Sequence, residues 1–222
     1  VNILGSLNLL QAAAGHCGKF LFASSGGTVY GEQHTHPADE AHSTQPMSPY
    51  GVTKLSVEKY LYFYQQTYGL PCVALRYANV YGPRQSPHGE AGVVAIFIQK
   101  MLAGVTPVIN GDGLQTRDYV YIDDVVQANL RALDADQTGA FNIGVGVETT
   151  VVDIFTALNA AFGGGFNAQH GPGREGEQRR SVLHPGLAER ALGWRPQVAF
   201  DEGLARTLAW FRAQATDSRS SG

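Results

Sequence analysis

Apolar residues along the 222-residue chain follow two kinds of pattern. In residues 1–14 and 50–68 apolar side chains recur at spacings of three and four, which is typical of helices that pack through one face. Residues 19–25 and 72–82 are short, continuous apolar runs, which are typical of strands buried on both faces. Because strand, helix and strand alternate, the pattern predicts an α/β fold with a parallel sheet and right-handed crossovers.

Shorter elements follow in the second half of the chain. Further helices are expected at 93–103, at 151–162, from Asp123 onward, and in "LHPGLAERALGW" and "FDEGLARTLAWFRAQ"; strands are expected in "PVING", "RDYVYI" and "GAFNIGVG". These small elements predict a carboxy-terminal lobe beside the sheet. Residues 216–222 are polar and are predicted to form a disordered tail.

Composition narrows the class of partner. The chain has a formal net charge of −3, so it lacks the broad basic field that binds nucleic acid or a membrane surface. No apolar run reaches the roughly 18 residues of a membrane span. Cys17, Cys72 and the seven histidines show no metal-ligand spacing, and the cysteines suit a reducing compartment. We therefore expect a cytoplasmic protein without a metal site.

Polar residues follow the first two expected strands. Ser24 and Ser25 end one strand, Asn79 lies near the end of the next, and Tyr50 follows the loop between them. Ligands in open α/β sheets bind beyond the carboxyl ends of the strands, so these groups should line one crevice. Tyr50 and Lys54 share a helix face. From spacing alone they are either a surface pair or a phenol whose proton is made labile by a neighbouring ammonium.

Ordered motifs along nearly the whole chain carry a family resemblance. The Tyr50-x-x-x-Lys54 pair follows "SSGGTVYG" and precedes "LRYANVYGPRQ", "GDGLQTRDYVYIDDVVQA", "GREGEQRR" and "LGWRP". In this order they resemble the extended short-chain dehydrogenase/reductase family, within it the nucleotide-sugar epimerases of the UDP-glucose 4-epimerase type. The resemblance implies the C-terminal part of a Rossmann-type doubly wound parallel sheet with a smaller α/β substrate-binding lobe. It assigns residues 1–85 to the dinucleotide-binding domain and 86–215 mostly to the lobe, with some segments returning to the sheet.

The family's dinucleotide-binding turn does not occur in these residues. Family members open with a strand, a Gly-x-x-Gly-x-x-Gly turn and a helix whose amino end holds the pyrophosphate. This chain opens directly on a helical pattern. We therefore expect it to lack the amino-terminal dinucleotide-binding half and to be inactive alone. The resemblance implies NAD as the cofactor, while the choice between NAD and NADP would depend on that segment.

The same resemblance assigns the catalytic groups. Tyr50 would be the acid and base, its pKa lowered by the charges of Lys54 and an oxidised nicotinamide. Lys54 would also bind the nicotinamide ribose. Relatives usually place a catalytic serine or threonine where this chain has Gly26. Ser25 is the favoured replacement and Thr28 the alternative.

Two sets of binding residues are implied as well. The cofactor-binding residues would be Asn2, Ser24, Tyr50, Lys54 and Tyr77. The substrate-binding residues would be Asn79, Arg84, Arg117, Arg174 and Glu177, because arginine forks suit phosphate oxygens and carboxylates suit ribose diols. A different interpretation of Arg117 is an ion pair with the adjacent Asp118.

Two positions favour epimerisation among the family's reactions. Related dehydratases and decarboxylases carry an extra acid just before the "VYG" motif, where this chain has Gly27 and Thr28. We therefore expect NAD-dependent C4 epimerisation of a UDP-hexose through a 4-keto intermediate. The alternatives are a 4-keto-sugar reductase or dehydratase, or an inactive nucleotide-sugar-binding fragment. The sugar and the nucleotide base stay open.

The resemblance also implies a homodimer. Residues 1–14 and 50–68 carry apolar faces that would form a two-fold four-helix interface with a second copy. The other interpretation is that these faces only cover the sheet.

Overall fold

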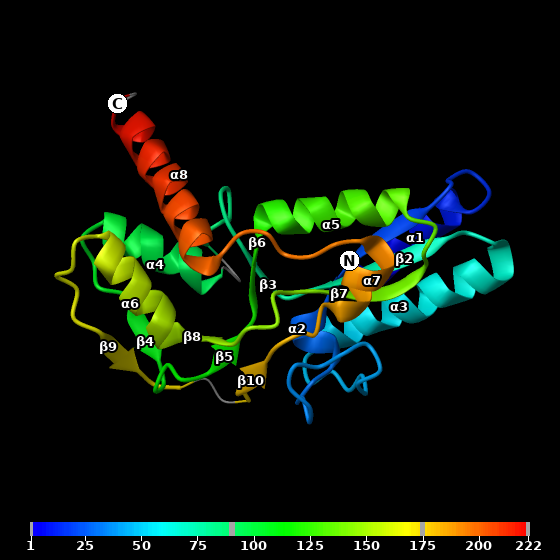
Figure 1. Cartoon of the computed structure of the whole chain (residues 1–222), viewed down its shortest axis with the longest axis horizontal. Coiled ribbons are helices and arrows are strands. Elements are labelled where there is room, and N and C mark those ends of the chain that lie inside the picture. Colours follow the sequence, from blue (N-terminus) through cyan, green and yellow to red (C-terminus); the bar gives the residue numbers. More distant parts are fainter. Residues whose placement is uncertain (1, 89–91, 174–175, 221–222) are drawn as a thin grey trace.

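Three parallel strands form the central sheet (Figure 1). The computed structural model describes residues 2–88, 92–173 and 176–220. The strands stand in the order β1, β2, β7, and their bounds are Phe20–Ser25, Cys72–Tyr77 and Gly139–Ile143. The first two are in register, with Ser25 opposite Tyr77 at their carboxyl ends. The predicted α/β fold with a parallel sheet is confirmed.

Helices cover both faces of this sheet (Figure 1). Cys72 and Ala74 of β2 are buried in the core beneath α1 and α3, whereas Val73 and Leu75 are buried beneath α5 and α7. Because alternate residues face opposite sides of a strand, a strand covered on both sides is apolar throughout. The bounds of these helices are Asn2–Ala13 (α1), Pro49–Tyr68 (α3), Ile122–Asp134 (α5) and Gly186–Leu192 (α7).

A lobe of smaller elements lies beside the sheet (Figure 1). Its helices α4, α6 and α8 pack around Ile98, Ile154 and Leu208. Strand β3 pairs with β6, β4 pairs with β9, and β5 lies between β10 and β8. The bounds are Asn79–Tyr81 (β3), Val93–Leu102 (α4), Val108–Asn110 (β4), Thr116–Arg117 (β5), Tyr119–Tyr121 (β6), Thr149–Thr150 (β8), Val151–Ala161 (α6), Gln169–Gly171 (β9), Arg180–Ser181 (β10) and Phe200–Ser220 (α8).

Two segments differ from the sequence-based expectation. The apolar run 72–82 was expected to be one strand, but it forms β2 and β3 in two different sheets. The backbone changes partners at Ala78, whose N–H donates to Ile143, while the N–H of Asn79 donates to Asp118. Residues 216–220, expected to lie in a disordered tail, continue α8. Within that helix the Thr216 hydroxyl donates to a backbone carbonyl one turn earlier.

Asp118 joins the lobe to the sheet. Its side chain is buried, and its carboxylate accepts backbone hydrogen bonds from Val145, Gly146 and Leu183 at 2.8, 3.0 and 3.2 Å. A Cβ on Gly144 would lie 2.5 Å from a carboxylate oxygen, so only glycine fits there. Burial raises the pKa of Asp118 to about 6, although the three N–H donors oppose the shift.

Because the pKa of Asp118 is raised in the folded state, its contribution to the free energy of unfolding should depend on pH. The folded-state pKa lies above the ordinary value of 3.8, so the contribution is present below that pH and is lost as pH rises through about 6. The difference in unfolding free energy between the unmodified protein and Asp118→Asn should therefore fall by about 1–3 kcal/mol from pH 4 to pH 7.

Denaturant titrations at both pH values measure this difference. Asp136→Asn, which removes an exposed carboxylate, is the matched control. A difference for Asp118→Asn that does not change with pH would contradict the prediction.

Candidate active site

A cleft of about 640 Å³ opens at the carboxyl ends of β1 and β2 and reaches into the lobe. It brings together residues from the strand ends, α2 (Gly26–Val29), α3, β3, β5 and the segment before β10. Those that the sequence singled out are Ser25, Thr28, Tyr50, Tyr77, Asn79, Arg117 and Glu177. The crevice expected at this edge of the sheet is therefore present.

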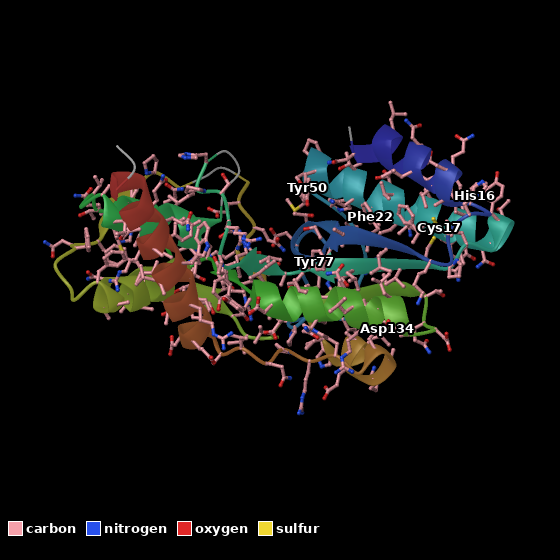
Figure 2. The ribbon with its side chains drawn as sticks, turned by 90° about the horizontal axis from the view of Figure 1, so that it is seen from above. His16, Cys17, Phe22, Tyr50, Tyr77 and Asp134 are labelled. Carbon is pink, nitrogen blue, oxygen red and sulfur yellow. The ribbon has the colours of Figure 1, made fainter. Side chains whose placement is uncertain are left out.

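Helix α3 brings Tyr50 to the cleft. The Ser48 hydroxyl accepts the N–H of Gly51 at 3.1 Å and caps the helix, and Pro49 starts its first turn. Tyr50 is therefore held at the end of α3 that faces the lobe, as Figure 2 shows. Its ring is 44% exposed, so the phenol is accessible to a ligand.

Lys54 lies one turn after Tyr50, between α3 and β1. Its amino group donates to the Ala23 carbonyl at 2.7 Å and lies 5.5 Å from the centroid of the Tyr50 ring. The Phe22 ring lies beneath it, at 4.8 Å. Burial lowers the pKa of Lys54. A cation held beside the phenol favours its ionised form, which is the condition for a tyrosine base.

Two residues with hydroxyl groups lie beside Tyr50. A Cβ at Gly26 would lie 2.4 Å from a methyl carbon of the buried Leu183, so a serine at this position would have to displace that side chain. Ser25 and Thr28 both line the cleft. The Thr28 oxygen is buried and has no hydrogen-bond partner among the residues that the structure describes. Thr28 therefore carries an unsatisfied hydroxyl beside the cleft.

Several predicted residues are not among those lining the cleft, and Lys54, one turn behind Tyr50, is one of them. Ser24 is a correction: strand alternation turns it to the face opposite Ser25, where it is buried and donates to Glu58 at 2.5 Å. Asn2 donates to Thr53 of α3 at 3.3 Å. Arg84 has a left-handed backbone with φ of 67°. Arg174 lies outside the described residues.

Arg117 presents its guanidinium to the cleft from β5. One nitrogen donates to the Thr116 carbonyl at 2.8 Å, and another lies 3.5 Å from a carboxylate oxygen of Glu177. The alternative ion pair with Asp118 is wrong, because the Asp118 carboxylate accepts backbone N–H groups on the other side. Across the cleft Asn79 is exposed at the start of β3. Arginine and amide donors placed in this way suit phosphate oxygens.

Part of the lining carries no motif that marks it in the sequence. The amino end of α4 faces the cleft through Gly92 and Val93, and no side-chain hydrogen bond caps its N–H groups within the part of the chain that the structure describes. Uncapped N–H groups at a helix start favour anions. Gln85 and Gln178 line the same cleft, and Gln178 donates to the Gly31 carbonyl at 2.6 Å. The helix itself was expected from residue 93, but its amino end was not assigned to the site.

The described residues also bear on metal binding, on the state of the cysteines and on membrane-spanning helices. In residues 2–88, 92–173 and 176–220, no three His, Cys, Asp or Glu side chains are grouped so that they could hold a metal ion. Cys17 is exposed, Cys72 is buried, and both are free thiols. Within the same described ranges, each helix is too short or too polar to cross a membrane.

Comparison with solved structures shows the same fold in sugar-nucleotide enzymes. The UDP-glucose 4-epimerase of Thermotoga maritima, solved with UDP-glucose, superposes with a TM-score of 0.94 at 47% identity, covering 96% of this chain and 70% of that one. The Thermus thermophilus UDP-glucose 4-epimerase, solved with NAD, gives a TM-score of 0.88 at 45% identity over the same shares.

Sequence comparison agrees with the structural match. The UDP-glucose 4-epimerase of Mycolicibacterium smegmatis is 47% identical over 215 residues, which are 96% of this chain and 68% of that protein. The family model "NAD dependent epimerase/dehydratase family" matches residues 1–144. With its parallel sheet, Tyr50 at the cleft and Lys54 one turn behind it, this chain belongs to the NAD dependent epimerase/dehydratase family.

Proposed function

We propose that this protein inverts C4 of a UDP-hexose through a transient 4-keto sugar, with NAD as a recycled cofactor. The observation that carries the proposal is the packing of Lys54 beside Tyr50, which lines a cleft together with Ser25, Thr28 and phosphate-suited donors. The Thermotoga maritima relative, solved with UDP-glucose, supports the choice of substrate class.

The cleft residues divide the work of this reaction. When bound beside Tyr50 and Lys54, NAD would supply the reversible hydride transfer that inversion at C4 requires. Tyr50 takes the proton of the C4 hydroxyl and gives it back, while Lys54 stabilises the phenolate. Thr28 or Ser25 would donate a hydrogen bond to the same sugar oxygen. No step consumes cofactor or releases a group, so the products balance the substrate.

The lobe would bind the nucleotide diphosphate. Arg117, Asn79 and the uncapped start of α4 offer donors to phosphate oxygens. Glu177 would accept from ribose hydroxyls. Holding the diphosphate while leaving the sugar unclamped would let the ketone turn between the two hydride transfers.

The residues present fit only one end of the cofactor. Tyr50 and Lys54 suit a nicotinamide and its ribose, but the glycine turn from β1 into α2 leads into a helix of only four residues. The 222 residues contain no Gly-x-x-Gly-x-x-Gly. We propose that tight NAD binding and turnover need a further segment carrying such a turn, and that residues 1–222 alone are inactive.

Replacing the phenol tests the proposed chemistry. In the chain joined to a glycine-rich dinucleotide-binding segment, Tyr50→Phe and Lys54→Met should lower kcat for UDP-glucose to UDP-galactose at least about 100-fold. Tyr60→Phe, an exposed tyrosine on the same helix, is the control and should keep its rate. Proton NMR of the two sugars gives the rate directly.

Cofactor balance separates the alternatives. An epimerase leaves added NAD unchanged at the end of the reaction. Net consumption of reduced cofactor would instead indicate a 4-keto-sugar reductase, and loss of water would indicate a dehydratase. Retained UDP binding without turnover in the extended protein would indicate a binding module.

We also propose a homodimer built on α1 and α3. These helices pack against each other (Figure 2), and apolar side chains on them stay exposed: Leu4 at 72%, Leu9 at 63%, Tyr62 at 67% and Phe63 at 47%. Two copies of such a surface would form a four-helix interface.

A cytoplasmic location is proposed as well, because both cysteines are free.

A charge in this surface should separate the copies. The double variant Leu4→Glu/Tyr62→Glu should run as a monomer in light scattering where the unmodified chain runs as a dimer, because the charges would be buried. Leu130→Glu, which places the same charge on a half-exposed leucine of α5, should stay dimeric. A monomeric unmodified chain, or a dimer that survives the double variant, would rule out this interface.

A further inference from the structure

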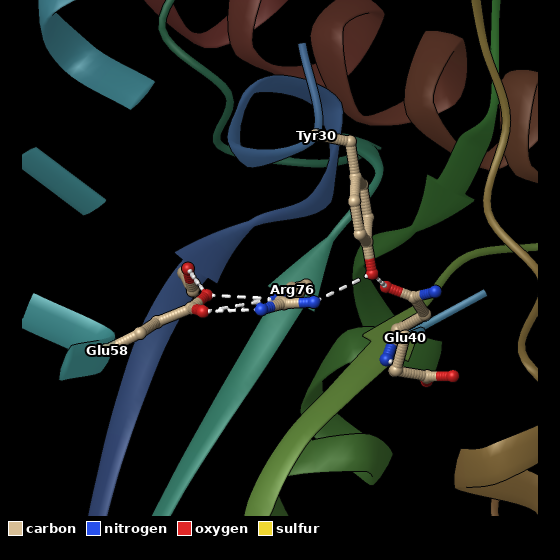
Figure 3. Close-up of polar contacts among 6 residues, drawn as sticks. Tyr30, Glu40, Glu58 and Arg76 are labelled. Atoms are coloured by element: carbon tan, nitrogen blue, oxygen red, sulfur yellow. Dashed lines mark hydrogen bonds and ion pairs between the residues drawn. The ribbon is translucent and has the colours of Figure 1, made fainter. Parts of the chain in front are cut away.

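A buried ion pair lies behind the cleft, where the reaction proposed above makes no use of it. Arg76 of β2 and Glu58 of α3 meet at 2.6 Å, and their side chains are only 8% and 7% exposed (Figure 3). The Arg76 Nε also donates to both carboxylate oxygens, at 3.0 and 3.3 Å. Burying two charges costs solvation that their attraction often does not recover, so such a pair is weak evidence for stability. The contacts of Arg76 and Glu58 with the elements around them indicate a further role for the pair.

Glu58 continues the face of α3 that carries the catalytic pair. Tyr50, Lys54 and Glu58 follow one another at intervals of four residues, so they lie along one side of the helix. Lys54 is bound to the Ala23 carbonyl of β1, and Glu58 is bound to Arg76 and to Ser24. Successive turns of α3 are thus attached to the strand ends, and Glu58 lies about 12 Å along the helix from Tyr50.

The guanidinium of Arg76 also binds Tyr30, which lies close in sequence to Thr28. Its Nη1 donates to the Tyr30 oxygen at 2.9 Å, and Tyr30 donates to Asn142 at 2.7 Å (Figure 3). Tyr30 directly follows α2 and stands two residues after Thr28. One guanidinium therefore holds both the segment that carries Thr28 and the helix that carries Tyr50.

The loop between these two segments is held by the same group of side chains. Asn142 donates from its side chain to the Ala38 carbonyl at 3.0 Å, and its backbone N–H donates to Glu40 at 2.7 Å. Residues 31–48, which link Thr28 to Tyr50, are therefore pinned at their middle as well. Burial raises the pKa of Tyr30, so its phenol stays protonated and keeps donating.

We propose that Arg76 and Glu58 are positioning residues that set the separation between the Tyr50 phenol and the hydroxyls of Ser25 and Thr28; this rests on the epimerase proposed above. Arginine suits the role because its planar fork donates in two directions at once. A lysine would keep the charge but bind only one partner well. Neither Arg76 nor Glu58 is among the residues that line the cleft, so their effect should fall on catalysis rather than on substrate binding.

Kinetics of variants in the extended, active protein test this role. Glu58→Gln, Arg76→Lys and Tyr30→Phe should each lower kcat about 10- to 100-fold, because displacing a reacting group by about 1 Å costs rates of this order. The KM for UDP-glucose should stay within about threefold, because Arg117 and Asn79 are held by other elements. A merely structural role would lower thermal stability without this split between kcat and KM.

A matched ion pair serves as the control. Arg206 and Glu202 of α8 also meet at 2.6 Å, but they are 47% and 52% exposed and lie away from the cleft. Glu202→Gln and Arg206→Lys should leave kcat unchanged. Equal losses in both pairs, or unchanged kcat in all three test variants, would overturn the positioning role.

A structural measurement keeps this test separate from the proposed function. Crystal structures of the unmodified chain and of Glu58→Gln give the separation between the Tyr50 and Thr28 oxygens, which should change by about 1 Å. Tyr30→Phe, which removes one hydroxyl, serves if Glu58→Gln does not fold. An unchanged separation would overturn the positioning role whatever the activity. Absence of epimerisation in the unmodified extended protein would overturn the proposed function alone.

Discussion

The attachment of α3 to the ends of β1 and β2 is the contact on which the candidate active site depends. Lys54 meets the Ala23 carbonyl, and Glu58 meets the buried Arg76, so the helix cannot slide along the sheet without breaking hydrogen bonds to charged groups. Because Tyr50 lies one turn before Lys54 on the same helix, these contacts also fix the place of Tyr50. A tyrosine that transfers a proton must be held at a fixed distance from the reacting group. A helix attached to the sheet at two successive turns holds Tyr50 in this way.

The cleft exists because the chain changes sheets at Ala78. Up to that residue the strand belongs to the central sheet, and after it the strand pairs with β6 in the lobe. Asp118 strengthens this junction by accepting N–H groups from the turn after β7 and from Leu183. The residues proposed to react therefore stand on α2, α3 and the end of β1, whereas the phosphate-suited donors stand on the lobe. This division suits a substrate whose sugar must move while its diphosphate stays bound.

Prediction from sequence succeeded where the signal was local or followed a spacing. The helix that carries Tyr50 was expected at about 50–68 and is observed at Pro49–Tyr68, because its cap and its terminal glycine are encoded at its ends. Side-chain direction was harder to predict. Ser24 and Ser25 are equivalent as letters, yet one binds Glu58 inside the protein and the other lines the cleft. Arg76 was missed because it lies in an apolar run with no nearby sequence signal of a partner.

The sequence by itself determined the order of helices and strands, the buried sheet and the pairing of Tyr50 with Lys54, since each depends on residues within a few positions of one another. Only the tertiary structure decided that Arg117 faces Glu177 rather than Asp118, and that Arg76 joins Glu58 to Tyr30. Those partners are separated by 60, 18 and 46 positions along the chain. Contacts across such separations depend on packing, which no local pattern records.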